Sequence, residues 1–411
     1  MSSAEILSKI DGMENRLVEF TKNLMRIRSI SPQAEYREIV HFLDEAYRSI
    51  GLEVKLLTGS EDKIAKIGFK YPRHNVLGRL KGSGEGPTLA IYSHMDTVDV
   101  ADLQAWKSDP FQPTLRDGKI FGLGAMDARC SIACAFFAAK VIKESGVRLK
   151  GNFIIMGVVD DEVVFDELGW PGTPYLVEEG HKASGWGIPD YVINGEGSGL
   201  DTVVNAFKGR YTFEITFEGQ RAHAGTTFGV NALEHGLHFV NAIKSMELKE
   251  SPKMGKDLIT IFAFLGGKEG HIDIPNSCTV GIDIRFVEGY GADRAKLFVQ
   301  SKIEELKKKY PNLNPSRMKM IHDWSPSEIN SSSPLVRALE QSAANIGIQL
   351  KRSGLFGAGQ NLPYLQKGIP AVTYGAGSFD RPHSPNEYVE VQELVKQTKV
   401  YAQTALLLCG A

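Results

Sequence analysis

The sequence has no long apolar run and no block of residues of one charge. None of its apolar stretches reaches the roughly 18 residues that a membrane-spanning helix needs. The N-terminus, MSSAEILSKIDGMENRL, lacks the uninterrupted apolar segment of a signal peptide. The formal net charge is −2 at pH 7, which gives no electrostatic support for binding to nucleic acid or to a membrane surface. We therefore expect no nucleic-acid partner and no membrane association.

Cysteine is scarce, since the 411 residues include four, at positions 130, 134, 278 and 409. Cys130 and Cys134 could share one helix face as half of a metal site, but no second pair with ligand spacing follows. Small buried thiols are the favoured interpretation. Nothing in this pattern requires an oxidising compartment, so we expect a cytoplasmic protein.

The length and the periodicity of the chain indicate two domains, because 411 residues exceed the size of one ordinary core. Up to residue 206, apolar runs such as PTLAIYSHMD and GNFIIMGVV alternate with helical patterns, which is typical of an α/β domain with a largely parallel sheet. From residue 207, segments such as GRYTFEITFEG alternate apolar and polar residues, as half-exposed antiparallel strands do. We predict an α/β domain, residues 1–206 and 319–411, interrupted by a smaller α+β domain, residues 207–318.

Residues with metal-ligand chemistry lie just beyond the apolar or glycine-rich runs of the α/β domain. They are His94, Asp96, Asp127, Asp160, Asp161, Glu162, Glu196 and His383. Ligands gather at the carboxyl ends of strands in open α/β sheets, and clustered carboxylates repel one another unless a cation neutralises them. Two divalent ions about 3.5–4 Å apart would use this many ligands. We therefore predict a site for two ions, with Zn²⁺, Mn²⁺ or Co²⁺ suited to mixed imidazole and carboxylate ligands.

Several motifs resemble, in order along the chain, those of the M20 metallopeptidase family. That family includes acetylornithine deacetylase, succinyl-diaminopimelate desuccinylase, aminoacylase-1 and carboxypeptidase G2. The motifs are SHMDTV, DPFQPTLRDGKIFGLGAMD, GVVDDE, NGEGS, GQRAHAG, GIDIRF and GIPAVTYGAGSFDRPHSPNEYVEV. The resemblance implies a two-metal hydrolase whose catalytic domain is split around a lid domain that often dimerises, so a homodimer is expected.

The resemblance also implies a role for each candidate residue of the metal site. The implied ligands are His94, Asp127 as the bridging carboxylate, Glu162, Glu196 and His383. Asp96 resembles the acid that orients His94 without itself binding a metal. Asp161 is the implied general base, which takes a proton from a water whose pKa the two ions lower.

Three residues are implied to contact the substrate. His223, in AHAG, resembles the histidine that stabilises an oxyanion in a neighbouring active site. Arg285, in DIR, resembles the residue that binds a substrate carboxylate, and Gly377 lies in the loop that often donates a backbone N–H to the same carboxylate. His223 could instead be a solvated loop residue, and Arg285 could pair with Asp283 at the sheet edge.

The chain departs from the family pattern at the implied base. The family usually carries a Glu-Glu pair there, whereas alignment on the strand FIIMGVV gives Asp161-Glu162. About five extra residues, VFDEL, enlarge the loop that follows, and an alignment on the later Gly-Thr would make Asp166 and Glu167 the working pair. We favour the strand alignment, because burial fixes the register of a strand end whereas loops absorb insertions.

Two further departures concern residues around the implied pocket. Gln360 and Asn361 stand where the family has Thr-Asp, which removes a carboxylate and predicts a substrate different from those of the amino-acid deacylases. Arg129 replaces a lysine that often follows the bridging aspartate by two residues, a milder change.

We therefore predict a metal-dependent hydrolase of an amide C–N bond in a small carboxylate-bearing substrate, such as an N-acyl amino acid or a dipeptide. An alternative is an aminohydrolase that releases ammonia from a non-amide C–N bond, as in an amino-aromatic acid of the nitroanthranilate type. A third hypothesis is a metal-binding homologue without catalysis, in which the change from Glu to Asp at position 161 abolished the base.

Overall fold

The computed structural model describes residues 3–66, 68–100, 102–162, 171–287, 291–355, 359–377 and 383–410. The chain forms two compact units. Unit 1 comprises Met1–Asn205, Ile329–Ser353 and Pro363–Ala411, and unit 2 comprises Ala206–Glu328 and Gly354–Leu362. Each unit has its own hydrophobic core.

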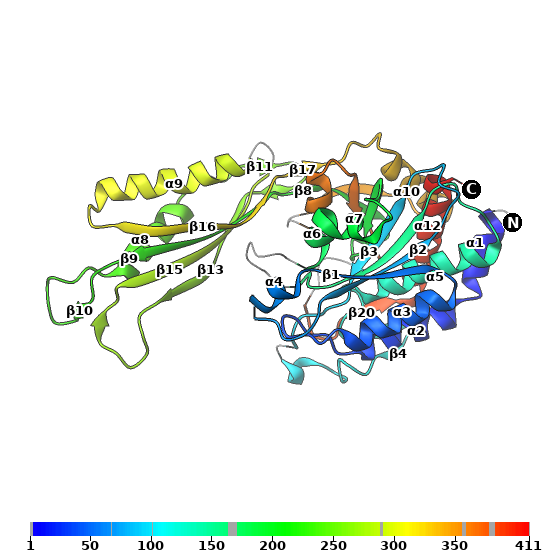
Figure 1. Ribbon diagram of the computed structural model, residues 1–411, viewed down its shortest axis with the longest axis horizontal. Coiled ribbons are helices and arrows are strands. Elements are labelled where there is room, and N and C mark those ends of the chain that lie inside the picture. Colours follow the sequence, from blue (N-terminus) through cyan, green and yellow to red (C-terminus); the bar gives the residue numbers. More distant parts are fainter. Residues whose placement is uncertain are drawn as a thin grey trace. The chain divides into compact units, whose positions relative to one another are not determined.

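Unit 1 is built on a sheet whose strands are neighbours in the order β1-β2-β6-β3-β7-β19-β8 (Figure 1). The bounds are β1 Glu53–Thr58, β2 His74–Leu80, β6 Phe153–Val158, β3 Leu89–His94, β7 Tyr191–Asn194, β19 Ala371–Thr373 and β8 Thr202–Phe207. The four central strands, β6, β3, β7 and β19, are parallel. The outer strands are antiparallel to their neighbours. The predicted α/β fold with a largely parallel sheet is therefore confirmed.

Both faces of this sheet are buried, which explains why its strands read as unbroken apolar runs. Along β3, Leu89 and Ile91 belong to one apolar cluster, whereas Ala90 and Tyr92 belong to another on the opposite face. Long helices cover the first face: α2 Glu14–Arg26, α3 Arg37–Ser49, α5 Arg129–Ser145, α10 Pro334–Ala344 and α12 Val391–Cys409. Helix α5 ends at Gly146, whose φ of 72° is left-handed.

Shorter elements complete unit 1. The helical ones are α1 Ser3–Asp11, α4 Glu61–Lys66, η1 Leu103–Ala105, α6 Thr173–Tyr175, η2 Leu176–Gly180, α7 His181–Ser184 and α11 Leu362–Gln366. A small antiparallel sheet joins β4 Thr114–Arg116, β5 Lys119–Phe121 and β20 Tyr388–Glu390, and β18 Lys351–Leu355 pairs with β8. This small sheet links the segment before residue 127 to the segment after residue 383.

Unit 2 is a four-stranded antiparallel sheet with the order β13-β15-β9-β16. Its strands are β13 Leu258–Gly266, β15 Ser277–Arg285, β9 Arg210–Glu218 and β16 Asn314–Trp324, and the predicted boundary at residue 318 falls inside β16. The helices α8 Ala232–Lys244 and α9 Ala292–Lys309 pack on one face of this sheet. The two-residue strands are β10 Ala222–His223, β11 Glu250–Ser251, β12 Gly255–Lys256, β14 Asp273–Ile274 and β17 Ser327–Glu328.

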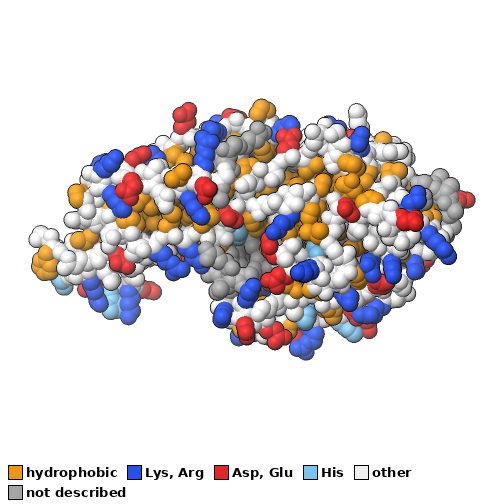
Figure 2. Space-filling view, turned by 45° about the horizontal axis from the view of Figure 1, so that its top comes forward, with side chains coloured by type: hydrophobic (Ala, Val, Ile, Leu, Met, Phe, Trp, Pro, Cys, Tyr) orange, Lys and Arg blue, Asp and Glu red, His pale blue; other side chains and the backbone are white. Residues whose placement is uncertain are grey.

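The surface shows mixed charge. On the face seen in Figure 2, basic and acidic side chains are interspersed. Among the described residues, no helix is both long and apolar enough to cross a membrane.

Candidate metal centre

The carboxyl ends of the central parallel strands bring most of the predicted ligands together. His94 ends β3 and lies opposite Val158, the last residue of β6. Asp161 and Glu162 follow β6, and Glu196 lies two residues beyond the end of β7, the other neighbour of β3. Parallel strands that begin in register also end at one edge, which is why segments far apart in sequence converge here.

Two groups of three side chains could each hold a metal ion. His94, Asp161 and Glu196 form one group, and His94, Asp127 and Glu162 form the other, with the ligand atoms within 4.8 Å of one another in each. The nearest pair is His94 Nε2 and Asp127 Oδ1, 2.8 Å apart. The structure thus brings together five of the residues that the sequence marks as ligands or base.

His383, the remaining predicted ligand, lies beside the second group. Its Nε2 is 3.1 Å from Glu162 Oε1 and 3.4 Å from Asp127 Oδ2. Asp127 therefore lies between the two histidines, His94 and His383, which is the position that a bridging carboxylate would need. Its placement fits the predicted role.

Burial and mutual repulsion raise the pKa values of three carboxyl groups in this centre. Burial, and then the charge of Glu196, raise the pKa of Asp161 well above its ordinary value. Burial raises the pKa of Glu196 to about 7 and also raises that of Glu162. Carboxylates in this situation are stabilised either by protons or by a cation.

Contacts among His94, His383 and Asp127 favour the charged form of each of these three side chains. Burial disfavours protonation of His94, but Asp127 and Asp96 outweigh it and hold the pKa of the imidazole well above its ordinary value. Hydrogen bonding to Asp127 and Glu162 raises the pKa of His383 to about 10. Burial opposes ionisation of Asp127, but the two histidines lower its pKa.

This set of donors fits divalent metal ions. It offers imidazole nitrogens and carboxylate oxygens, the ligands that suit Zn²⁺, Mn²⁺ and Co²⁺. Divalent ions bound among these side chains would offset the mutual repulsion of Asp161, Glu162 and Glu196, which burial strengthens. The residues that would hold such ions are His94, Asp127, Glu162, Glu196 and His383.

Asp96 contacts both His94 and the segment that carries Asp161. Its backbone carbonyl lies 3.0 Å from His94 Nδ1, and its carboxylate Oδ1 lies 3.6 Å from the same atom. The carboxylate also accepts the backbone N–H of Asp161 at 3.3 Å and of Glu162 at 3.1 Å. Asp96 is fully buried. These contacts let one side chain orient two parts of the centre.

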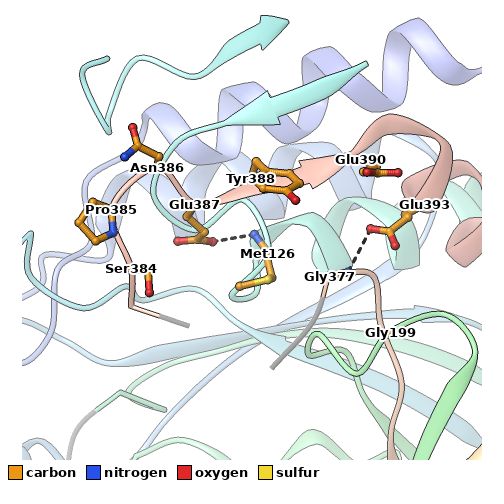
Figure 3. Close-up of a pocket in the computed structure, with 10 residues that line it drawn as sticks. All are labelled: Met126, Gly199, Gly377, Ser384, Pro385, Asn386, Glu387, Tyr388, Glu390 and Glu393. Carbon is orange, nitrogen blue, oxygen red and sulfur yellow. Dashed lines mark hydrogen bonds between the residues drawn. The ribbon is translucent and has the colours of Figure 1, made fainter. Parts of the chain in front are cut away.

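Glu387 is a residue that the sequence reasoning missed. Its buried carboxylate accepts the backbone N–H groups of Gly124, Met126 and Asp127 at 3.1, 2.7 and 3.1 Å. Figure 3 shows this side chain pointing toward Met126. Its place four residues after His383, in HSPNEY, is a signal that could have identified it. Glu387 holds the loop that presents Asp127.

Gly377 lines a cavity of about 390 Å³ together with Met126, Tyr388, Glu390 and Glu393. Its N–H donates to Glu393 Oε2 at 3.3 Å, and Figure 3 shows Glu393 pointing from α12 toward Gly377. A side chain at position 377 would meet Met126 at 2.3 Å, and the φ of 85° also favours glycine. The predicted donor to a substrate carboxylate is therefore already hydrogen-bonded to a carboxylate of the protein.

His223 and Arg285 both lie in unit 2. His223 is exposed on β10, and its Nδ1 accepts the backbone N–H of Gly225 at 3.1 Å. Arg285 donates from Nε to Asp283 Oδ2 at 2.7 Å, and Arg210 Nε lies 3.6 Å from the other oxygen of Asp283. The pairing of Arg285 with Asp283, one of the alternatives from the sequence, is present. Two guanidinium groups share this one carboxylate.

The remaining predictions concern positions away from the centre or outside the described residues. Asp166 and Glu167, the alternative working pair, lie outside the described residues. Arg129 is fully buried and donates to the carbonyls of Leu24 and Ile27. Gln360 and Asn361 are buried in unit 2.

The chain is similar to known proteins over most of its length. The sequence profile described as peptidase family M20/M25/M40 matches residues 90–407. The chain is 26% identical to an N-formyl-4-amino-5-aminomethyl-2-methylpyrimidine deformylase from Bacillus subtilis (strain 168) over 98% of this chain and 96% of that protein.

Solved structures share the fold at low sequence identity. A dipeptidase from Saccharomyces cerevisiae has a TM-score of 0.76 at 15% identity, covering 100% of this chain and 99% of that one. A dinuclear metal-binding peptidase of the M20 family from Bacillus subtilis has a TM-score of 0.66 at 14% identity, covering 96% and 98%.

Proposed function

Since the chain belongs to peptidase family M20/M25/M40 and is a metallohydrolase, we propose that it is a two-metal hydrolase of an amide C–N bond. The proposed substrate is a small carboxylate-bearing molecule such as an N-acyl amino acid or a dipeptide. The observation that carries this proposal is the convergence of ligand-type side chains at one edge of the sheet, with a histidine on either side of Asp127: His94, Asp127, Asp161, Glu162, Glu196 and His383.

Relatives with printed activities support the choice of bond. The Bacillus subtilis deformylase removes a formyl group from an amine, and the yeast enzyme is a dipeptidase, so both names describe amide hydrolysis. The dinuclear metal-binding peptidase supports the number of ions. Zn²⁺ and Mn²⁺ are the ions we propose, since the donors are imidazole and carboxylate.

The proposed mechanism assigns chemistry to the chain's own residues. Two divalent ions, held by His94, Asp127, Glu162, Glu196 and His383, would supply Lewis acidity that lowers the pKa of a water molecule. Asp161, beside His94 and Glu196, accepts the proton of the attacking water at its carboxylate and passes it to the leaving amine. The backbone carbonyl of Asp96 orients His94 through Nδ1. The Asp96 carboxylate accepts the backbone N–H of Asp161 and so holds the segment that carries the base.

Three further residues are assigned to substrate binding. His223 donates an N–H to the oxyanion that develops as water attacks. Arg285 binds the substrate carboxylate, and its guanidinium is oriented for this by Asp283. Gly377 donates its N–H to the same carboxylate once the hydrogen bond from this N–H to Glu393 is broken.

The second copy of the chain is the proposed partner, through the edge of the sheet in unit 2. Strand β13 is the edge strand, and it carries four large apolar side chains that are 42–64% exposed: Leu258, Phe262, Phe264 and Leu265. An unpaired edge with exposed apolar residues is a surface that proteins normally cover. We propose a homodimer that covers it. All four cysteines are free and buried, which supports the proposed cytoplasmic location.

The experiment that tests the function is a substrate panel with added Zn²⁺ or Mn²⁺. It contains N-formyl and N-acetyl amino acids, N-formylated amines without a carboxylate, dipeptides and amino-aromatic acids, and scores both released amine and released ammonia. Amine release from an N-acyl compound supports the proposal, and ammonia release from the aromatic acids alone would replace it with the aminohydrolase alternative. His94→Ala should abolish metal content and turnover, whereas His41→Ala, at an exposed helix position paired with Glu45, should not.

A further inference from the structure

The residue before the proposed base has an unusual backbone. Strand β6 ends at Val158, and Asp160, two residues later, has a φ of 59°. This left-handed conformation is uncommon for a residue with a side chain, although aspartate tolerates it better than most. It turns the chain out of the strand and so sets the direction of Asp161 and Glu162. Such a conformation persists where the surrounding structure holds it.

Tyr36 contacts Asp160 at two points. Its hydroxyl donates to Asp160 Oδ1 at 2.9 Å and accepts the backbone N–H of Asp160 at 3.2 Å. Tyr36 is 1% exposed, and Asp160 is fully buried. One hydroxyl group therefore satisfies both the backbone and the side chain of the residue that makes the turn. A buried N–H that loses its partner is destabilising, so this contact stabilises the left-handed conformation.

Arg73 forms an ion pair with the same residue. Its Nη1 lies 3.3 Å from Asp160 Oδ1, and both side chains are fully buried. The guanidinium is held by the carbonyls of Ala34 and Pro32, and its carbon lies 5.0 Å from the centroid of the Tyr36 ring. A buried carboxylate needs a partner of opposite charge. Arg73 supplies that charge, and Tyr36 supplies the directional hydrogen bonds.

A second chain of contacts fixes the residues after the turn. Ser31 donates to Asp96 Oδ2 at 2.7 Å. Asp96 in turn accepts the N–H groups of Asp161 and Glu162. The segment 160–162 is thus held at its first residue by Tyr36 and Arg73 and at the next two by Asp96.

We propose that Tyr36 is a positioning residue, which holds Asp160 in its left-handed turn and thereby places Asp161 and Glu162 for proton transfer and metal binding. Tyr36 acts through Asp160 and touches neither the substrate nor an ion. The proposal rests on the proposed function, since it presupposes that Asp161 is the base and Glu162 a ligand.

Tyr36→Phe tests this proposal, because it removes the hydroxyl and keeps the ring that packs against Arg73. Two quantities are measured: turnover of the N-acyl compound that the wild-type enzyme hydrolyses fastest in the panel, and binding of Zn²⁺ alone by calorimetry. We expect kcat and the affinity for the weaker-bound Zn²⁺ each to fall by about tenfold, the usual size for a residue that orients a ligand. KM should stay within about twofold of the wild-type value, because the substrate contacts are unchanged.

Tyr47→Phe is the matched control. Tyr47 is also fully buried in unit 1, but its hydroxyl has no hydrogen-bond partner among the described residues. Tyr47→Phe should leave kcat, KM and Zn²⁺ binding at their wild-type values. The proposal is overturned if Tyr36→Phe and Tyr47→Phe behave alike in both measurements.

A double-mutant cycle covers the case in which loss of the hydroxyl lowers overall stability. Asp160→Asn keeps the size of the side chain and a residue type that tolerates the left-handed region, but removes the charge that faces Arg73. If Tyr36 acts through Asp160, the two substitutions will not be additive in kcat. Additive effects would overturn the proposal.

Asp161→Asn separates a failure of the positioning role from a failure of the proposed function. If Asp161→Asn is inactive while Tyr36→Phe keeps the wild-type kcat and Zn²⁺ affinity, the positioning role is wrong and the proposed function stands. If Asp161→Asn keeps the wild-type kcat, the proposed function itself is wrong.

Discussion

The Glu387 carboxylate accepts the backbone N–H of Asp127 at 3.1 Å, together with those of Gly124 and Met126. Three donors converge on one buried side chain, so the loop that carries Asp127 depends on it. The contact ties the segment after His383 to the segment before α5, and so links two of the proposed ligands.

Glu387→Gln should therefore weaken both the fold and metal binding. A glutamine has one carbonyl oxygen, and its NH₂ group would face an N–H donor, which leaves a buried donor unsatisfied at a cost of about 1–3 kcal/mol. We expect a lower denaturation midpoint and weaker Zn²⁺ binding by calorimetry. Glu393→Gln is the control, since that carboxylate accepts the N–H of Gly377, at 3.3 Å, instead of the N–H of Asp127. Equal behaviour of the two variants would contradict the role of Glu387.

Arg285→Met should raise KM selectively. If the guanidinium binds a substrate carboxylate, its loss removes a charge-assisted hydrogen bond worth about 1.5–3 kcal/mol, or roughly 10- to 150-fold in kcat/KM. The substrates to compare are an N-acetyl amino acid and an N-formylated amine that lacks a carboxylate. The first should lose efficiency and the second should not. An equal loss for both would show that Arg285 acts by pairing with Asp283 alone.

Glu393→Ala should improve the binding of carboxylate-bearing substrates. The variant frees the N–H of Gly377 and removes one negative charge from the cavity beside Met126. We expect KM for N-acetyl amino acids to fall by about three- to tenfold, the equivalent of one hydrogen bond. Glu390→Ala is the matched control, because Glu390 lines the same cavity but pairs with Lys119. A rise in KM for Glu393→Ala would mean that this carboxylate contacts the substrate directly.

Replacement of Leu265 by lysine should separate the proposed dimer. Leu265 is 64% exposed on the edge strand β13, and a charge at an edge opposes pairing with a second strand. Light scattering coupled to size exclusion should report a dimer for the wild type and a monomer for the variant. Leu297→Lys, at a 63% exposed position of α9, should remain dimeric. A monomeric wild type would refute the homodimer directly.

The sequence predicted the fold because burial leaves a strong pattern. The strands ending at His94 and Val158 are buried at every position and mostly apolar, as strands covered on both faces are, and the ligand-type residues stand at or just beyond their ends. Their convergence follows from parallel pairing, which brings strand ends to one edge.

The supporting contacts could not be predicted in the same way. Tyr36 and Arg73 contact the side chain of Asp160, and Glu387 accepts backbone N–H groups beside Asp127, and no periodicity marks partners so far apart in the sequence. Arg73 is a charged residue that is fully buried, against the usual preference, and its partner Asp160 is visible only in three dimensions. The hydrogen bond from the Gly377 N–H likewise goes to Glu393, which lies 16 residues later in the chain.

The most direct test of the central claim compares Asp161→Asn with Asp166→Asn in the same assay, on the best N-acyl substrate with Zn²⁺ or Mn²⁺. Asp161→Asn should lower kcat by at least about a hundredfold, as expected for loss of a general base, while two metal ions remain bound. Asp166→Asn should stay within about threefold of wild-type kcat, because the strand alignment does not make Asp166 the base. If Asp166→Asn abolished turnover and Asp161→Asn did not, the assignment of Asp161 as the base would be wrong.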